Sequence, residues 1–180
     1  KELDYHAFSI IRYDQMPYKV VATFKNNDMQ PFLLPTLIYN FAMRYNEANV
    51  LVEINDLGQE VVDLLWNELE YENIITTTVR GRKGQVMDAG FSKHERQYGV
   101  RMSAKVKRVG CAMLKEMVEQ DKLIIPDFDI INELASFVSK RGAFEAEVGH
   151  HDDLVISLLL FAWASNQEYF KDLTDINIRE

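Results

Sequence analysis

The pattern of side chains at the start of the chain predicts a β-hairpin. Residues 5–13 and 18–24 are rich in β-branched and aromatic side chains, which favour strands. Between them lies Asp14-Gln15-Met16-Pro17, a tetrapeptide of turn-forming residues. We therefore expect the chain to begin in a sheet.

Apolar residues then recur at three- and four-residue spacing, which is typical of amphipathic helices. One helix is expected over 35–47, with Pro35 in its first turn, and another is expected to run to Glu70 after a cap at Asn55-Asp56. Between them, 50–54 is a short, nearly continuous apolar run that indicates a strand covered on both faces. Further along we expect a strand over 73–77, a helix over 103–120 capped by Ser103, a strand over 123–125, a short helix capped by Asp129, a hairpin turning at 140–142, and an apolar helix over 154–164 opened by Asp152.

This order of elements favours the α/β class, with a mixed β-sheet flanked by helices on both faces and an antiparallel edge. The chain has 180 residues, of which 47% are hydrophobic and 27% are charged, so it can bury one substantial core. It contains no low-complexity linker, and we expect a single domain over 1–180.

Three classes of protein are disfavoured by the sequence. Cys111 is the only cysteine, which excludes an intrachain disulfide and a Cys-rich zinc site. No apolar run approaches the roughly 18 residues that would span a bilayer, so no membrane is expected among the partners. Neither of the glycine-rich phosphate-binding patterns, GxxxxGK[ST] and GxGxxG, occurs, which argues against nucleotide hydrolysis by this segment.

Charge is distributed unevenly along the chain. The formal net charge is −8, which by itself argues against nucleic-acid binding. The window 80–115 nevertheless carries a net +8, so the remainder carries −16, and it also holds five of the eight glycines. Its ten basic residues are Arg80, Arg82, Lys83, Lys93, Arg96, Arg101, Lys105, Lys107, Arg108 and Lys115.

The basic window has two interpretations. Charged runs are usually solvated faces, and this one could be such a face. Its glycines and its aromatic residues Phe91 and Tyr98 also suit a loop that adapts to a phosphate backbone.

Glu53 is an unexpected carboxylate in the apolar run 50–54, because burying an ionised group without a partner is costly. It could face solvent at the carboxyl end of the strand. It could otherwise be paired or bound to a cation.

A second acidic motif, Gly149-His150-His151-Asp152-Asp153, directly precedes the apolar helix. Carboxylates at a helix start commonly cap the free N–H groups, so Asp152 and Asp153 could serve for capping only. Neighbouring helical positions point about 100° apart, however, so one acid could cap while the other approaches Glu53. Two such carboxylates would bind Mg²⁺ or Mn²⁺ in preference to zinc. The two histidines could add a ligand or a proton donor, or be structural or exposed.

Acids that bind metal, placed beside a basic strip, have the electrostatic layout of a nuclease. Three segments of the chain together resemble the nuclease domain of the large terminase subunit of T-even-like tailed bacteriophages, the motor that packages and cuts concatemeric DNA. They are Asp4-Tyr5-His6-Ala7, Val52-Glu53-Ile54-Asn55 with Gly58 just beyond, and Gly149-His150-His151-Asp152-Asp153-Leu154-Val155 leading to Ser157-Leu158. The segments 107–111 and 121–125 are also similar to the family, so the resemblance covers nearly the whole chain.

The resemblance implies a ribonuclease H-like fold in which three acids from separate elements bind two divalent ions, Mg²⁺ or Mn²⁺, and hydrolyse phosphodiesters. Carried over to this chain, Glu53 and Asp153 are catalytic residues and metal ligands, and Asp152 is a supporting or alternative ligand. Asp4 and His151 are expected near the site. The first acid of the family lies on a strand before the position of Asp4, so we expect the first strand to be truncated here. The expected DNA-binding residues are Arg80, Arg82, Lys83, Arg101, Lys105, Lys107 and Arg108.

The same resemblance implies the setting of the protein. The expected partners are double-stranded DNA, an ATPase domain of the same polypeptide that precedes this segment, the portal and the small terminase subunit. The expected location is the host cell cytoplasm, where the packaging machinery works. Two alternatives remain open: a non-catalytic module for DNA binding or motor docking on the same fold, and a resolvase- or integrase-type nuclease.

Overall fold

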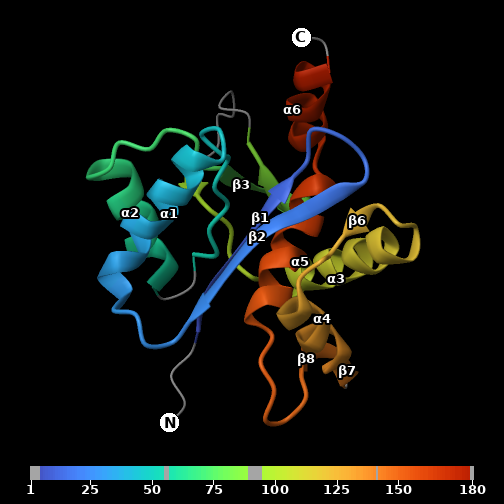
Figure 1. Ribbon diagram of the computed structural model, residues 1–180. Helices are drawn as coiled ribbons and strands as arrows, with labels where there is room; N and C mark the ends of the chain where they lie inside the picture. The colour runs from blue at the N-terminus through green and yellow to red at the C-terminus, as the bar shows by residue number, and fades with distance from the viewer. Residues whose placement is uncertain (1–4, 55–56, 89–94, 141, 179–180) are drawn as a thin grey trace. The chain divides into compact units, whose positions relative to one another are not determined.

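The computed structural model describes residues 5–54, 57–88, 95–140 and 142–178 (Figure 1). Within these ranges the chain forms two compact units, each with its own core. The first unit comprises the described residues of 1–27, 107–166 and 170–180. The second unit comprises those of 28–106 and 167–169.

A mixed three-stranded sheet forms one layer of the first unit. Strands β1 (His6–Arg12) and β2 (Tyr18–Asn26) pair antiparallel, which confirms the predicted hairpin. The short strand β6 (Leu123–Ile124) adds to β2 in parallel. The fold is therefore of the mixed α/β type, as the sequence predicts.

Helix α5 (Asp153–Ser165) lies at the centre of the first unit and packs against β1 (Figure 1). Most of its side chains are buried, among them Leu154, Leu158 and Leu159, because an apolar helix without a polar face must be covered on every side. Helix α5 also makes a polar contact with β1, where the hydroxyls of Ser9 and Ser157 lie 2.6 Å apart. The other elements here are α4 (Phe128–Ala135), the hairpin β7 (Phe137–Lys140) and β8 (Ala143–Ala146), and α6 (Glu168–Ile178).

The second unit combines a helix pair with a small antiparallel sheet. Helices α1 and α2 pack on each other around Ala42, Val61 and Leu65, and the predicted first-turn position of Pro35 is confirmed. In the sheet, β3 pairs with β4 on one side and β5 on the other. The bounds are η1 (Pro31–Leu33), α1 (Leu34–Arg44), α2 (Leu57–Asn67), β3 (Thr76–Arg80), η2 (Gly81–Lys83), β4 (Gly84–Met87) and β5 (Arg96–Tyr98).

The segment 50–54 differs from the expected continuous strand. It forms two isolated parallel bridges, between Val50 and Ile74 and between Glu53 and Val100, because it changes its partner halfway along. Close approach to the second partner requires Gly99, which has a φ of +80° and whose Cβ would lie 2.5 Å from the Val52 carbonyl oxygen. Within 50–54 only the last residue is buried, so the prediction of a strand covered on both faces is wrong.

The observed helix N-caps agree only in part with those predicted from the sequence. Helix α3 (Ala104–Glu119) begins as expected, because the Val106 N–H donates to Oγ of Ser103 (3.2 Å). The predicted cap of α4 is wrong, because the capping carboxylate is Asp127 and Asp129 lies in the first helical turn. The predicted cap at Asn55-Asp56 lies outside the described residues. Among the described residues, no helix is long and apolar enough to cross a membrane.

Candidate active site

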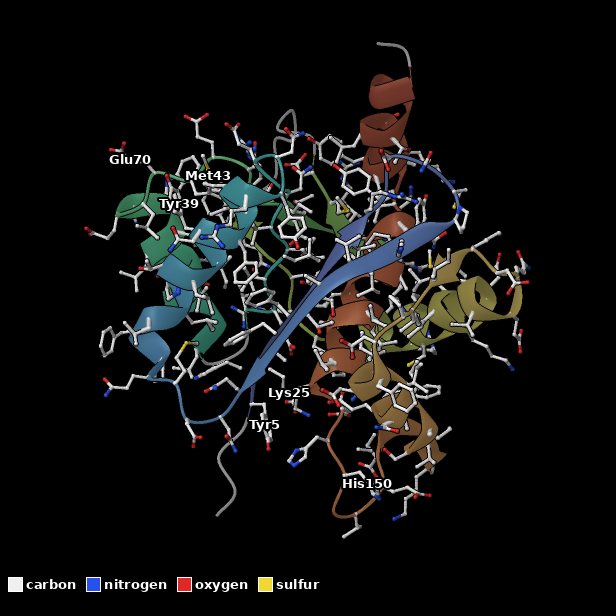
Figure 2. All side chains as sticks on the ribbon, in the orientation of Figure 1. Tyr5, Lys25, Tyr39, Met43, Glu70 and His150 are labelled. Atoms are coloured by element: carbon white, nitrogen blue, oxygen red, sulfur yellow. The ribbon has the colours of Figure 1, made fainter. Side chains whose placement is uncertain are left out.

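Asp153 is the first residue of α5 and lies in a charged cluster of the first unit. Its side chain is 26% exposed. Its Oδ2 atom lies 3.6 Å from the Lys25 ammonium and 3.9 Å from Nδ1 of His151. The ring of Tyr5 completes the cluster, with the Lys25 Nζ atom 4.3 Å from its centre (Figure 2). The ring of His151 lies edge-on to the ring of Tyr5. The structure thus brings together Asp153 and His151, and it adds a lysine and a tyrosine.

The electrostatics of this cluster favour a positive charge on Lys25, beside the Asp153 carboxyl group. Burial raises the pKa of Asp153; Lys25 lowers it in part, Glu133 raises it further, and the balance is a raised pKa. Burial alone would lower the pKa of Lys25, but the hydrogen bond and charge of Glu133, together with Asp153, outweigh burial and raise it. The lysine therefore stays charged beside a carboxylate whose ionised form is costly to bury.

The start of α5 is capped by a residue that the sequence did not indicate. Asp152 precedes the helix, but its side chain makes no capping hydrogen bond. The N–H groups of Leu154 and Val155 instead donate to Oε2 of Glu133, at 2.8 and 3.1 Å. Asp152 directly precedes α5, as expected of a residue that opens this helix, but the side chain that accepts from the free N–H groups is that of Glu133 on α4.

Glu53 is half-buried in the second unit, and its backbone is closely constrained. On one side it bridges to Val100. On the other, α2 approaches so closely that a Cβ on Gly58 would lie 1.7 Å from the Glu53 carbonyl oxygen. Gly58 therefore belongs to the motif for a steric reason: no side chain fits between the helix start and Glu53.

Several of the predicted DNA-binding residues gather on the β3–β4 hairpin of the second unit. Arg80, Arg82 and Lys83 are exposed on this hairpin or its η2 turn. Lys105 joins them, because its ammonium donates to the Arg82 carbonyl (2.8 Å). The Gln85 amide holds the backbone of Arg101, accepting from its N–H and donating to its carbonyl, both at 2.8 Å. These five basic residues and Glu53 share one unit.

The basic window of the sequence does not lie in one unit. Lys107 and Arg108 belong to the first unit, on α3, where Arg108 is exposed. Lys107 is half-buried, with its Nζ atom 5.9 Å from the ring centre of Phe137. The window therefore supplies basic groups to both units.

The carboxylate oxygens of Glu53 and Asp153 are donors that suit divalent ions. Among the described residues, however, each unit contributes only one of these two carboxylates. Over the described part of the chain, no group of three or more His, Cys, Asp or Glu side chains could hold a metal ion. Glu53 and Asp153 belong to different units, and Asp4 lies outside the described residues. The half-buried carboxylate of Asp153, with its raised pKa, fits a hard cation that would neutralise it.

Lys25 and Glu133 are site residues that the sequence analysis missed. Glu133 carried a signal, because it lies three residues after Ile130 and is therefore on the buried face of a short helix. A buried carboxylate requires hydrogen-bonded partners. Lys25 carried no comparable signal, since its partners lie far away in the sequence.

A family model described as the terminase RNase H-like domain matches residues 1–163. The match covers β1 through most of α5, and so includes both Glu53 and Asp153.

Proposed function

This chain belongs to the terminase RNase H-like domain family, and from that premise we propose that it is a metal-dependent endonuclease domain. It cuts concatemeric double-stranded DNA, with little sequence preference, in the packaging motor of a T-even-like tailed phage. In this proposal both compact units act as one nuclease domain. The observation that carries it is the state of Asp153, a half-buried carboxylate that faces the Lys25 ammonium and is not needed to cap its own helix.

In the proposed site, Glu53 and Asp153 hold the metal, with Asp152 as an alternative ligand. Nucleases of the RNase H-like class typically use divalent ions, and here we propose Mg²⁺ or Mn²⁺, two per site. When bound, such ions activate water and stabilise charge on the phosphate. Asp4 and His151 are proposed to lie near this site. His151 Nδ1 lies 3.9 Å from Oδ2 of Asp153.

DNA is proposed to bind along the basic hairpin of the second unit and α3. Exposed Arg and Lys side chains on β3, η2 and the start of α3 suit phosphate oxygens, which are the same in every sequence. Contacts of this kind explain cutting with little sequence preference. The proposed phosphate-contacting residues are Arg80, Arg82, Lys83, Arg101, Lys105, Lys107 and Arg108.

Membership of a terminase family implies DNA and packaging machinery as partners, inside a host cell. More specifically, we propose contacts with an ATPase domain of the same polypeptide, the portal and the small terminase subunit, in the host cytoplasm.

The test uses the purified 180-residue chain with supercoiled plasmid and Mg²⁺ or Mn²⁺. We expect nicking or linearisation that EDTA stops, and loss of at least a hundredfold in rate in Glu53→Gln and in Asp153→Asn. Glu119→Gln is the matched control, because it removes an exposed carboxylate that pairs with Lys115, away from the proposed ligands. This control should cut at the rate of the unsubstituted chain.

Other outcomes select the alternatives. Equal cutting by Glu53→Gln and Asp153→Asn would refute the assigned site. Salt-sensitive DNA binding without metal uptake or cleavage, even after an upstream acid-bearing strand is added, would select the non-catalytic module. A strong preference for branched DNA would select the resolvase type.

A further inference from the structure

The first turn of α5 depends on a carboxylate from another helix. A helix start leaves free N–H groups, which usually find an acceptor on the residue that precedes the helix. Here that residue is Asp152, which makes no such bond, and Oε2 of Glu133 accepts from Leu154 and Val155 instead. Because Glu133 accepts these hydrogen bonds, the Asp153 carboxylate can face Lys25.

The second oxygen of Glu133 connects this cap to Asp153. Oε1 accepts a hydrogen bond from the Lys25 ammonium at 2.5 Å, and the same ammonium lies 3.6 Å from Oδ2 of Asp153. The Glu133 side chain is 7% exposed and that of Lys25 is 19% exposed, so solvent screens these contacts little. One carboxylate thus holds both the backbone at Asp153 and the cation that faces its side chain.

Helix α4, which carries Glu133, is anchored at its other end to the same strand. Asp127 caps α4 through the N–H groups of Asp129 and Ile130, at 2.9 and 3.1 Å. The Thr23 hydroxyl donates to the other Asp127 oxygen at 2.6 Å. Thr23 and Lys25 lie two residues apart on β2, so they point to the same side of the sheet and hold both ends of α4.

We propose that Glu133 is a positioning residue for Asp153: it caps α5 from a neighbouring helix and, through Lys25, restricts the Asp153 carboxylate to one orientation. This inference rests on the proposed function only in so far as Asp153 binds metal. Hydrogen-bonding groups behind metal ligands typically contribute ten- to a hundredfold in metal affinity. Removing Glu133 should therefore weaken metal binding by about tenfold or more.

The experiment compares Glu133→Ala and Glu133→Gln with the unsubstituted 180-residue chain. Three quantities are measured: amide hydrogen exchange at Leu154 and Val155, the three-bond couplings that report the χ1 angle of Asp153, and the Mn²⁺ dissociation constant by paramagnetic resonance. Met117→Ala is the matched control, because it opens a cavity in the core of the same unit and removes none of the hydrogen bonds or ion pairs of this network.

In Glu133→Ala we expect faster exchange at both amides, averaging of the Asp153 rotamers, and at least tenfold weaker Mn²⁺ binding. Glu133→Gln retains an oxygen for the amides but loses the charge that holds Lys25. It should keep most of the amide protection and lose at least threefold in Mn²⁺ affinity. Met117→Ala should lose stability with unchanged Asp153 couplings and Mn²⁺ affinity.

The inference is overturned if Glu133→Ala keeps the amide exchange, the couplings and the Mn²⁺ affinity within twofold of the unsubstituted chain. Should Glu133→Ala fail to fold, unchanged Mn²⁺ affinity in Glu133→Gln overturns it equally. Failure of the proposed function has a different signature: Asp153→Asn then binds Mn²⁺ as well as the unsubstituted chain. In that case the amide exchange and the Asp153 couplings still decide the positioning role.

Discussion

At the scale of single residues, Gly58 and Asp127 show how one side chain, or its absence, controls a local backbone. Gly58 permits α2 to begin against the carbonyl of Glu53. Asp127 accepts three hydrogen bonds, from Thr23, Asp129 and Ile130, and so fixes the start of α4. One residue supports each half of the proposed active site.

Substitution of Gly58 by alanine should disturb Glu53 directly. The added Cβ would lie 1.7 Å from the Glu53 carbonyl oxygen, so either the strand or the helix must move. We expect a loss of about 3 kcal/mol in the free energy of unfolding, in the upper range for a single substitution, together with loss of cutting. Denaturant titration and the plasmid assay measure the two effects. The neighbouring control Gln59→Ala should change the free energy of unfolding by less than about 0.5 kcal/mol, because this side chain is exposed. Similar stability of the Gly58→Ala and Gln59→Ala variants would contradict the steric explanation.

Replacement of Asp127 by asparagine should reveal an acid-dependent contribution to stability. Burial alone raises the pKa of Asp127, but the hydrogen bonds from Thr23 and from the Ile130 and Asp129 amides outweigh it and lower the pKa below its usual range. A lowered pKa stabilises the fold above the unfolded value of about 3.9, and this stabilisation is lost as the pH falls through the lower folded value. Asparagine also caps helices well, so it isolates the effect of charge.

Chemical unfolding of both proteins between pH 7 and pH 2 measures this contribution. The advantage of the unsubstituted chain over Asp127→Asn should be constant above pH 5 and vanish at the acid end. An advantage that grows as the pH falls would contradict the assignment.

At the scale of elements, α5 joins the core of the first unit to the proposed chemistry. Its first residue is Asp153, and the turns that follow are buried almost completely. Helix α5 is the central element of its core, and any loosening of it would displace the Asp153 carboxylate. The core therefore supports the site mechanically as well as contributing stability.

Truncation of Leu158, a fully buried residue of α5, should lower the free energy of unfolding by about 3 kcal/mol in Leu158→Ala, within the range for a buried leucine. The matched control is Ile131→Ala on α4, where the side chain is 44% exposed and the expected loss is below about 1 kcal/mol. Thermal or urea unfolding followed by circular dichroism distinguishes the two. Equal losses would show that α5 is not the centre of this core.

At the scale of the whole molecule, charge is divided in a way that the net value conceals. The chain carries −8 in total, yet exposed basic residues concentrate on the β3–β4 hairpin and the start of α3. Repulsion between the acidic remainder and DNA is long-ranged and is screened by salt. Local contacts with phosphates then decide whether the protein binds.

Binding of DNA should consequently show a salt dependence that follows the hairpin charges. In the double variant Arg82→Gln with Lys83→Gln, we expect affinity for any DNA sequence to fall on the order of tenfold at about 0.1 M salt. The slope of log K against log salt should decrease by roughly one for each phosphate contact removed. Lys115→Gln is the control, since this lysine belongs to the same sequence window but is 74% exposed and paired with Glu119. Fluorescence anisotropy at several salt concentrations gives both quantities, and an unchanged slope in the double variant would place the DNA elsewhere.

Features that depend on neighbouring residues were determined by the sequence itself. The β1–β2 hairpin, helices α1, α3 and α5, and the Ser103 cap all follow from side-chain periodicity and capping chemistry, which act over a few residues. Glu53 and Asp153 also stood out locally, as acids next to apolar runs. Trp66 shows the limit of this reasoning: it is a large aromatic residue of an amphipathic helix, α2, yet it is 40% exposed and lies against Tyr98.

The tertiary structure alone decided how these acids are surrounded. Nothing near Asp153 in the sequence indicates that Glu133, 21 residues before Leu154, caps its helix, or that Lys25, 108 residues from Glu133, holds both carboxylates. Within 50–54, likewise, the change of pairing partner depends on Gly99, far along the chain. The physical reason is the same in each case: local patterns determine which groups need a partner, whereas the folding of distant segments onto one another determines which partner they find.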